Sequence, residues 1–158
     1  MNHAAERSVV VITDGAELGC AIGKVLTACC SERVAVFSFT YKECGALLTP
    51  LRVEETSLFV LEIFRSYDGG LRAEGVVLAN RWRGQKPSLV ISPLHLGRLL
   101  QYDGYWDTAS DESLAARVDR LLRFPKKYLE GGSCLAEYFQ AMFVIPQQHS
   151  NAQSKKVR

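Results

Sequence analysis

The sequence has few of the residues that mark metal-binding or disulfide-stabilised proteins. Its three histidines are scattered at His3, His95 and His149, so they offer a metal ion no cluster of ligands. The five cysteines are odd in number and include no Cys-x-x-Cys pair, which argues against a zinc site and a disulfide framework. We therefore expect small, buried thiols, Cys20 among them, in the reducing environment of the cytoplasm.

Long apolar runs and a strong charge are also missing. No stretch reaches the ~18 to 20 uncharged apolar residues that a membrane-spanning helix needs, and the first residues do not have the layout of a signal peptide. The net charge is +2, and three basic residues, Lys155, Lys156 and Arg158, lie in the terminal tail, so the body carries 2 − 3 = −1. We expect no membrane and no nucleic-acid partner.

The chain does contain an alternation of short apolar runs and amphipathic segments. The predicted strands are 8–12, 33–39, 57–64, 86–93 and 103–107, and the predicted helices are 16–29, 40–48, 68–82, 94–101 and 110–123. Strands that alternate with helices predict an α/β fold with a parallel sheet between two helical layers. We expect one domain over residues 1–124, an extension with one helix over 125–146, and a disordered polar tail over 147–158.

Two of the predicted helices carry detailed signals. In the first, the apolar residues recur at helical spacing and predict the buried stripe, namely Leu18, Ala21, Ile22, Val25, Leu26 and Cys29. In the last, Ser110 is expected as the N-terminal cap, with Asp111 and Glu112 in a first turn where the helix dipole favours negative charge.

Polar side chains stand where the predicted strands end. Thr13 and Asp14 follow the first strand, and three further residues take the same place on the third, fourth and fifth, namely Glu62, Ser92 and Thr108. In an open parallel sheet, binding sites form beyond the carboxyl ends of the strands. We therefore expect these residues to gather at one edge of the sheet.

Over residues 7–123 this order and spacing resembles the receiver domain of two-component response regulators. The stretch "LFVLEIF" followed by "DGG" is similar to the family's third strand and loop, and "DGYWDTASDESLAARVDRLLR" is similar to its fifth strand and helix. The resemblance implies a flavodoxin-like, doubly wound, five-stranded parallel sheet in the order 2-1-3-4-5, to which this chain would add its C-terminal helix. It also implies the role of each site residue: Glu62 at the phosphoacceptor position, Asp14 and Thr13 at the acidic pair, Ser92 and Tyr105 as the switch residues, and Thr108 at the lysine position.

Three of these positions depart from the family pattern. Thr13 replaces an acid, Thr108 replaces the cation, and Glu62 extends the carboxylate by one methylene. A 1 Å misplacement of a reacting group can cost about 10²-fold in rate, so ordinary phosphorylation is not expected. We expect no dedicated metal site, although Asp14 and Glu62 could hold Mg²⁺ weakly. Glu62 either supplies a fixed negative charge that keeps the switch partly on, or is only a polar residue at a strand end.

These features predict a stand-alone degenerate receiver that is not an enzyme and needs no cofactor. It would act by phosphorylation-independent contact with a protein partner, either a signalling component or part of a histidine kinase pathway, and it could form a homodimer. One alternative is a conventional phosphoacceptor regulator. Another is a small NAD(P)-binding Rossmann-type oxidoreductase, which Gly15 and Gly19 favour, whereas Asp14 and the absence of a Tyr-x-x-x-Lys pair argue against it.

Overall fold

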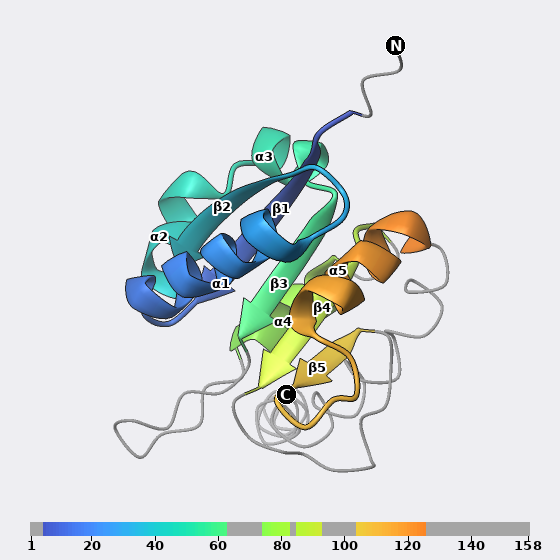
Figure 1. The fold of residues 1–158 in the computed structure, drawn as a ribbon. Helices are drawn as coiled ribbons and strands as arrows, with labels where there is room; N and C mark the ends of the chain where they lie inside the picture. The colour runs from blue at the N-terminus through green and yellow to red at the C-terminus, as the bar shows by residue number, and fades with distance from the viewer. Residues whose placement is uncertain (1–4, 63–73, 83–84, 93–103, 126–158) are drawn as a thin grey trace, which may run out of the picture.

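A computed structural model describes residues 5–62, 74–82, 85–92 and 104–125, and its centre is a five-stranded sheet (Figure 1). The strands are β1 (Arg7–Thr13), β2 (Val34–Thr40), β3 (Leu58–Glu62), β4 (Ser88–Ser92) and β5 (Tyr105–Asp107). They are all parallel and lie in the order β2-β1-β3-β4-β5. The predicted flavodoxin-like topology is therefore confirmed, while the helices expected over 94–101 and after Pro125 lie outside the described residues.

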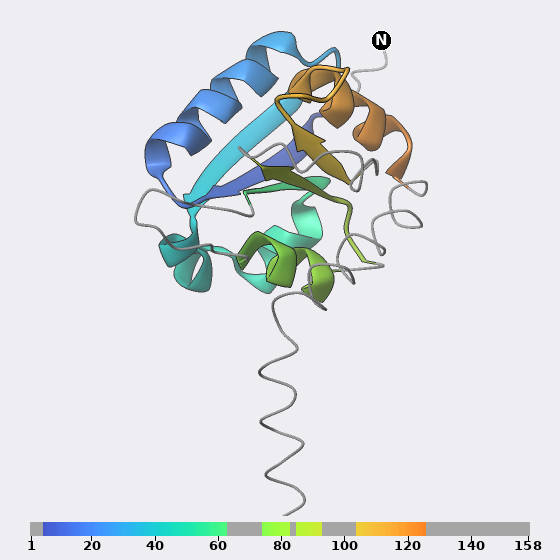
Figure 2. The same ribbon diagram turned by 90° about the horizontal axis from the view of Figure 1, so that it is seen from below.

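Helices cover both faces of the sheet. One layer contains α1 (Ala16–Cys29) and α5 (Leu114–Arg123), and the other contains α2 (Tyr41–Leu47), α3 (Pro50–Glu55) and α4 (Glu74–Arg81). Figure 2 shows the sheet between these two layers. Each layer encloses a core of its own, since alternate residues of a strand point to opposite faces.

The central strands are apolar on both faces, as burial on both sides requires. In β1, the four residues from Val9 to Ile12 are 0% exposed, and β3 is equally buried from Leu58 to Leu61. On the face of α2 to α4, the ring of Trp82 stacks on Phe59 with centroids 3.9 Å apart. This contact anchors the end of α4 to the middle of the sheet.

Helix α1 buries only two residues of the predicted stripe, Ile22 and Leu26. Its buried residues are Gly19, Ile22, Gly23 and Leu26, whereas Leu18 and Val25 are 43% and 46% exposed. Cys20 and Cys29 are also exposed, so the expectation of buried cysteines is wrong for these two. The reason is close approach: a Cβ on Gly19 would lie 3.0 Å from Thr13 Oγ1 and 3.3 Å from Ser38 Cβ. The two glycines therefore bring the helix backbone down onto the sheet.

Two helix boundaries also differ from the prediction. Helix α5 starts at Leu114 and is capped by Ser113, whose Oγ accepts from the Ala116 backbone N–H at 3.1 Å, so Ser110 is not its cap. Pro50 does end α2, as expected, but it also begins the short helix α3, which the sequence analysis did not predict. Proline is favoured at a first helical position, where no N–H is needed.

No helix in the described parts of the chain is both long and apolar enough to cross a membrane.

Candidate functional site

The carboxyl ends of four strands bring buried polar side chains to one edge of the sheet. Thr13, Glu62, Ser92 and Asp107 are the last residues of β1, β3, β4 and β5, and each is at most 8% exposed. The strand register places Glu62 beside Ile91 and Ser92 beside Asp107. Polar groups buried in this way require hydrogen-bond partners, and those partners determine what the edge can do.

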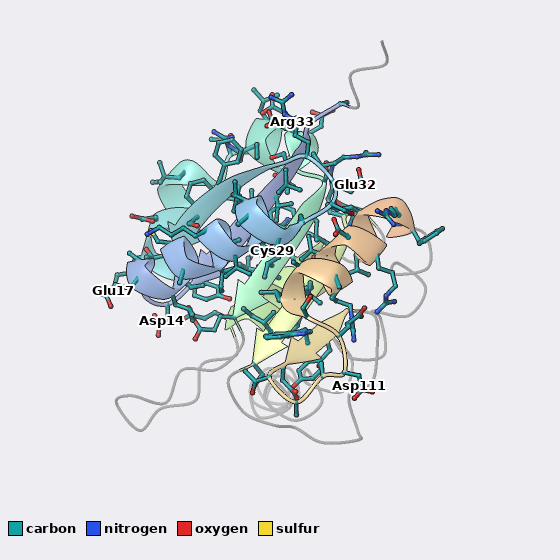
Figure 3. The ribbon with its side chains drawn as sticks, in the orientation of Figure 1. Asp14, Glu17, Cys29, Glu32, Arg33 and Asp111 are labelled. Atoms are coloured by element: carbon teal, nitrogen blue, oxygen red, sulfur yellow. The ribbon has the colours of Figure 1, made fainter. Side chains whose placement is uncertain are left out.

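Glu62 is joined to the turn after β1. Its Oε2 accepts a hydrogen bond from the backbone N–H of Asp14 at 3.0 Å. Asp14 lies at the start of α1, close to Glu17, and Glu32 and Arg33 lie at the opposite edge of the sheet (Figure 3). The carboxylate of Glu62 therefore ties the end of β3 to the β1–α1 turn, and a charge-assisted bond of this kind is stronger than a neutral one.

Tyr41 and Gly75 both lie against the backbone carbonyl of Glu62. The Tyr41 hydroxyl donates to the Glu62 carbonyl oxygen. Burial and the nearby charge of Glu62 raise the pKa of Tyr41, so the phenol stays a proton donor. Neither Tyr41 nor Gly75 was predicted as a site residue, because neither belongs to a spacing pattern in the sequence that could have indicated it.

Gly75 is the contact point of α4 at this edge. A Cβ built there would lie 2.6 Å from both the Glu62 carbonyl oxygen and the Tyr41 hydroxyl. Only glycine fits this approach, because such contacts are far below van der Waals distance. The first turn of α4 is thereby packed directly onto the end of β3.

Thr13 is turned inward, toward α1. It is 0% exposed, and its hydroxyl donates to the carbonyl oxygen of Gly15 at 2.8 Å. This hydrogen bond closes the β1–α1 turn. Gly19 packs against the same hydroxyl. This close packing explains why position 19 is a glycine, so no phosphate-binding role is needed to explain it.

The Tyr105 ring is buried, and its hydroxyl donates to Asp107 Oδ2 at 2.8 Å. The other carboxylate oxygen of Asp107 accepts from the Ala109 backbone N–H at 2.7 Å, and Asp107 N–H donates to Ser110 Oγ at 3.1 Å. Asp107 thus organises the turn after β5. This aspartate was not predicted as a site residue, although Asp is a common turn residue because its side chain can accept from the backbone N–H two residues later, as it does here from Ala109.

Thr108, at the position where the family resemblance implies lysine, is exposed. Across residues 5–62, 74–82, 85–92 and 104–125, no group of three or more His, Cys, Asp or Glu side chains could hold a metal ion. The edge of the sheet thus presents two structural carboxylates: Glu62 accepts from the Asp14 backbone N–H, and Asp107 accepts from the Tyr105 hydroxyl and the Ala109 backbone N–H.

Comparisons with known proteins add information on the fold only. No protein-family model matches the sequence, and no curated protein does. Among solved structures, a yeast Spc42 trimeric coiled-coil segment, amino acids 181–211, fused to another structure superposes over 98% of this chain and 99% of that chain. The TM-score is 0.52 and the sequence identity 13%, so this chain is similar to it in fold alone.

Proposed function

We propose that this protein is a degenerate receiver-like domain that works in signal transduction by binding another protein, without phosphoryl transfer. The observation that carries the proposal is the hydrogen bond between Glu62 Oε2 and the Asp14 backbone N–H, in a sheet with the order β2-β1-β3-β4-β5. A carboxylate used to join two strand ends is occupied by a structural task. This hydrogen bond holds the Glu62 side chain toward the β1–α1 turn, and Oε2 would have to leave it to attack a phosphorus atom.

The neighbouring residues support this interpretation. A receiver reaction needs Mg²⁺ held by carboxylate oxygens, and a cation to balance the phosphoryl charge. Thr13 uses its hydroxyl to close the β1–α1 turn, and Thr108 brings no positive charge. In the proposed function the charge of Glu62 is permanent, and it takes the place of a transient phosphoryl group.

The switch residues fit the same proposal. The Tyr105 hydroxyl is bonded to Asp107, and Asp107 lies beside Ser92 in the strand register. This arrangement fixes the tyrosine inside the protein without any ligand. A domain held in one state would present a constant surface to its partner.

The proposal also includes a cytoplasmic location and a protein partner. Cys20, Cys29, Cys30 and Cys44 are free thiols, which suits a reducing cytoplasm. The partner is a protein of a signalling pathway. A second copy of the chain is an additional partner that the proposal allows.

Phosphorylation can be tested directly. We expect the purified protein to show no +80 Da species by intact mass after incubation with acetyl phosphate and Mg²⁺. The Glu62→Asp variant, whose side chain is one methylene shorter, is the matched control that tests whether side-chain length alone prevents phosphorylation. A +80 Da species in the wild type that disappears in Glu62→Gln would contradict the proposal and favour a conventional phosphoacceptor.

Partner binding gives the second test. Pull-downs use the wild type, Glu62→Ala and Tyr105→Ala as baits. The wild type should recover a specific partner protein, and both variants should recover less of that same partner. Circular dichroism controls for folding. Equal recovery of the partner by all three baits would show that this edge of the sheet does not govern binding. A titration with NADH is a separate test, and a saturable response to it would favour the oxidoreductase alternative.

A further inference from the structure

A cleft of about 690 Å³ opens on the face of the sheet that α2, α3 and α4 cover, away from the strand-end site. Its walls are α2 and α3 on one side and α4 with Trp82, Gln85 and Lys86 on the other. The volume lies within the range of small-molecule sites in proteins, about 300 to 1,000 Å³. Figure 2 shows these three helices together on one side of the sheet.

The floor and walls of the cleft are mainly apolar. Trp82 is a buried part of the lining and stacks on Phe59, and the lining residues Leu48, Val53 and Leu78 are partly buried in the same core. Burial, followed by the charges of Glu43 and Glu74, raises the pKa of the Cys44 thiol to about 11. The thiol is therefore neutral at pH 7 and adds to the apolar lining.

The two ends of the cleft differ in charge. Arg81 and Lys86 line the end near the start of β4, while Cys44 lies at the other end, where Glu43 and Glu74 contribute negative potential. Lys86 Nζ donates to the Glu54 backbone carbonyl at 2.6 Å, which fixes the ammonium group on the wall of the cleft. Glu54 is the acidic residue among those that line the cleft, so the formal charge of Arg81, Lys86 and Glu54 together is 2 − 1 = +1.

We propose that this cleft binds an amphipathic anion, with its acidic head at Arg81 and Lys86 and its apolar tail along Trp82, Leu48 and Cys44. An apolar trough with cations at one end is complementary in shape and charge to a carboxylate carrying a hydrocarbon tail. The cations orient the ligand, and the apolar area that is removed from water supplies most of the affinity. This inference is independent of the proposed function, since it uses none of the strand-end residues.

The test is a fluorescence titration of the full chain with dodecanoate below its micelle concentration. The Trp106→Phe variant leaves Trp82 as the sole tryptophan, and Trp106 packs against the core on the opposite face of the sheet. We expect saturable quenching or a blue shift of Trp82. Arg81→Glu should weaken binding about tenfold, because an attraction is replaced by a repulsion.

Two controls make the outcome decisive. Lys24→Glu places the same charge change on α1, across the sheet, and should leave the affinity unchanged. Dodecyltrimethylammonium has the same tail and the opposite charge, and should bind at least about tenfold more weakly. Absence of saturable binding, equal binding of the two detergents, or an affinity insensitive to Arg81→Glu and Lys86→Glu would each overturn the proposal.

Discussion

Gly75 illustrates how much of this site depends on the absence of one carbon atom. The residue lies in the first turn of α4, against the Glu62 carbonyl and the Tyr41 hydroxyl. Neither contact can yield easily, since one atom belongs to the central strand β3 and the other to the partly buried Tyr41, whose hydroxyl is bonded to that strand. A methyl group here would push α4 away from the end of β3.

We therefore predict that Gly75→Ala destabilises the fold by about 1 to 3 kcal/mol, the usual cost of overpacking. Gly45→Ala is the matched control, because Gly45 also lies in a helix, α2, but a Cβ there would meet nothing within 4 Å. It should stabilise the protein by up to about 1 kcal/mol, since alanine favours helix. Urea unfolding measures both, and equal effects would contradict the packing described at Gly75.

At the level of single residues, the sequence indicated the polar groups at the ends of β1, β3 and β4, but not Asp107 at the end of β5 and not what these groups bind. The Glu62 bond to Asp14 joins positions 48 residues apart, and the Tyr41 bond to Glu62 joins positions 21 apart. Such pairs depend on the relative placement of strands and helices, which no local pattern encodes. Asp107 is different, because its turn is local and could have been predicted.

Helix α5 is attached to the α1–β2 loop by a carboxylate. Asp119 accepts from the backbone N–H groups of Ser31 at 2.8 Å and Glu32 at 3.1 Å. Burial opposes ionisation of Asp119, but the hydrogen bonds from Ser31 and Glu32 outweigh it and hold the pKa below the ordinary value of 3.8. The charged form is therefore favoured by folding.

Asp119→Ala should cost about 1 to 2 kcal/mol of stability at pH 7, since two backbone donors lose their acceptor. A lowered folded-state pKa stabilises the protein above pH 3.8, and this contribution is lost as the pH falls through the folded-state pKa. The difference between wild type and variant should therefore narrow below pH 3.8 in pH-dependent urea unfolding. The exposed Asp111→Ala is the control and should change stability by less than about 0.5 kcal/mol. A difference that is constant with pH would contradict this role.

Apart from the short helix α3, the type and order of the described elements were predictable, whereas the buried faces and caps of the helices were less so. Helix α1 is apolar on nearly all sides, so periodicity could not distinguish the stripe of Leu18 and Val25 from the buried one. Its orientation is set by Gly19 and Gly23, which contribute nothing to an apolar pattern but permit close packing. At α5, the predicted cap Ser110 instead accepts from the Asp107 backbone N–H in the turn after β5, and Ser113 caps the helix.

For the whole molecule, the alternation of strands and helices was enough to predict a parallel sheet, because crossovers must be right-handed and must cover apolar strands. The strand order followed from the resemblance to receivers, and the structure agrees with it. The cleft beside Trp82 could not be predicted, since it depends on how α3 sits relative to α4. The site and the cleft occupy different parts of one sheet, so their functions can be tested separately.

The most direct test of the central claim, that Glu62 is a structural acceptor for Asp14 and not a phosphoryl acceptor, is the amide signal of Asp14 in ¹H–¹⁵N spectra. We predict that this signal is protected from exchange and stays in place when Mg²⁺ and beryllofluoride are added, but moves and loses protection in Glu62→Ala. A shift of the Asp14 signal on addition of beryllofluoride, or an unchanged signal in Glu62→Ala, would contradict the account.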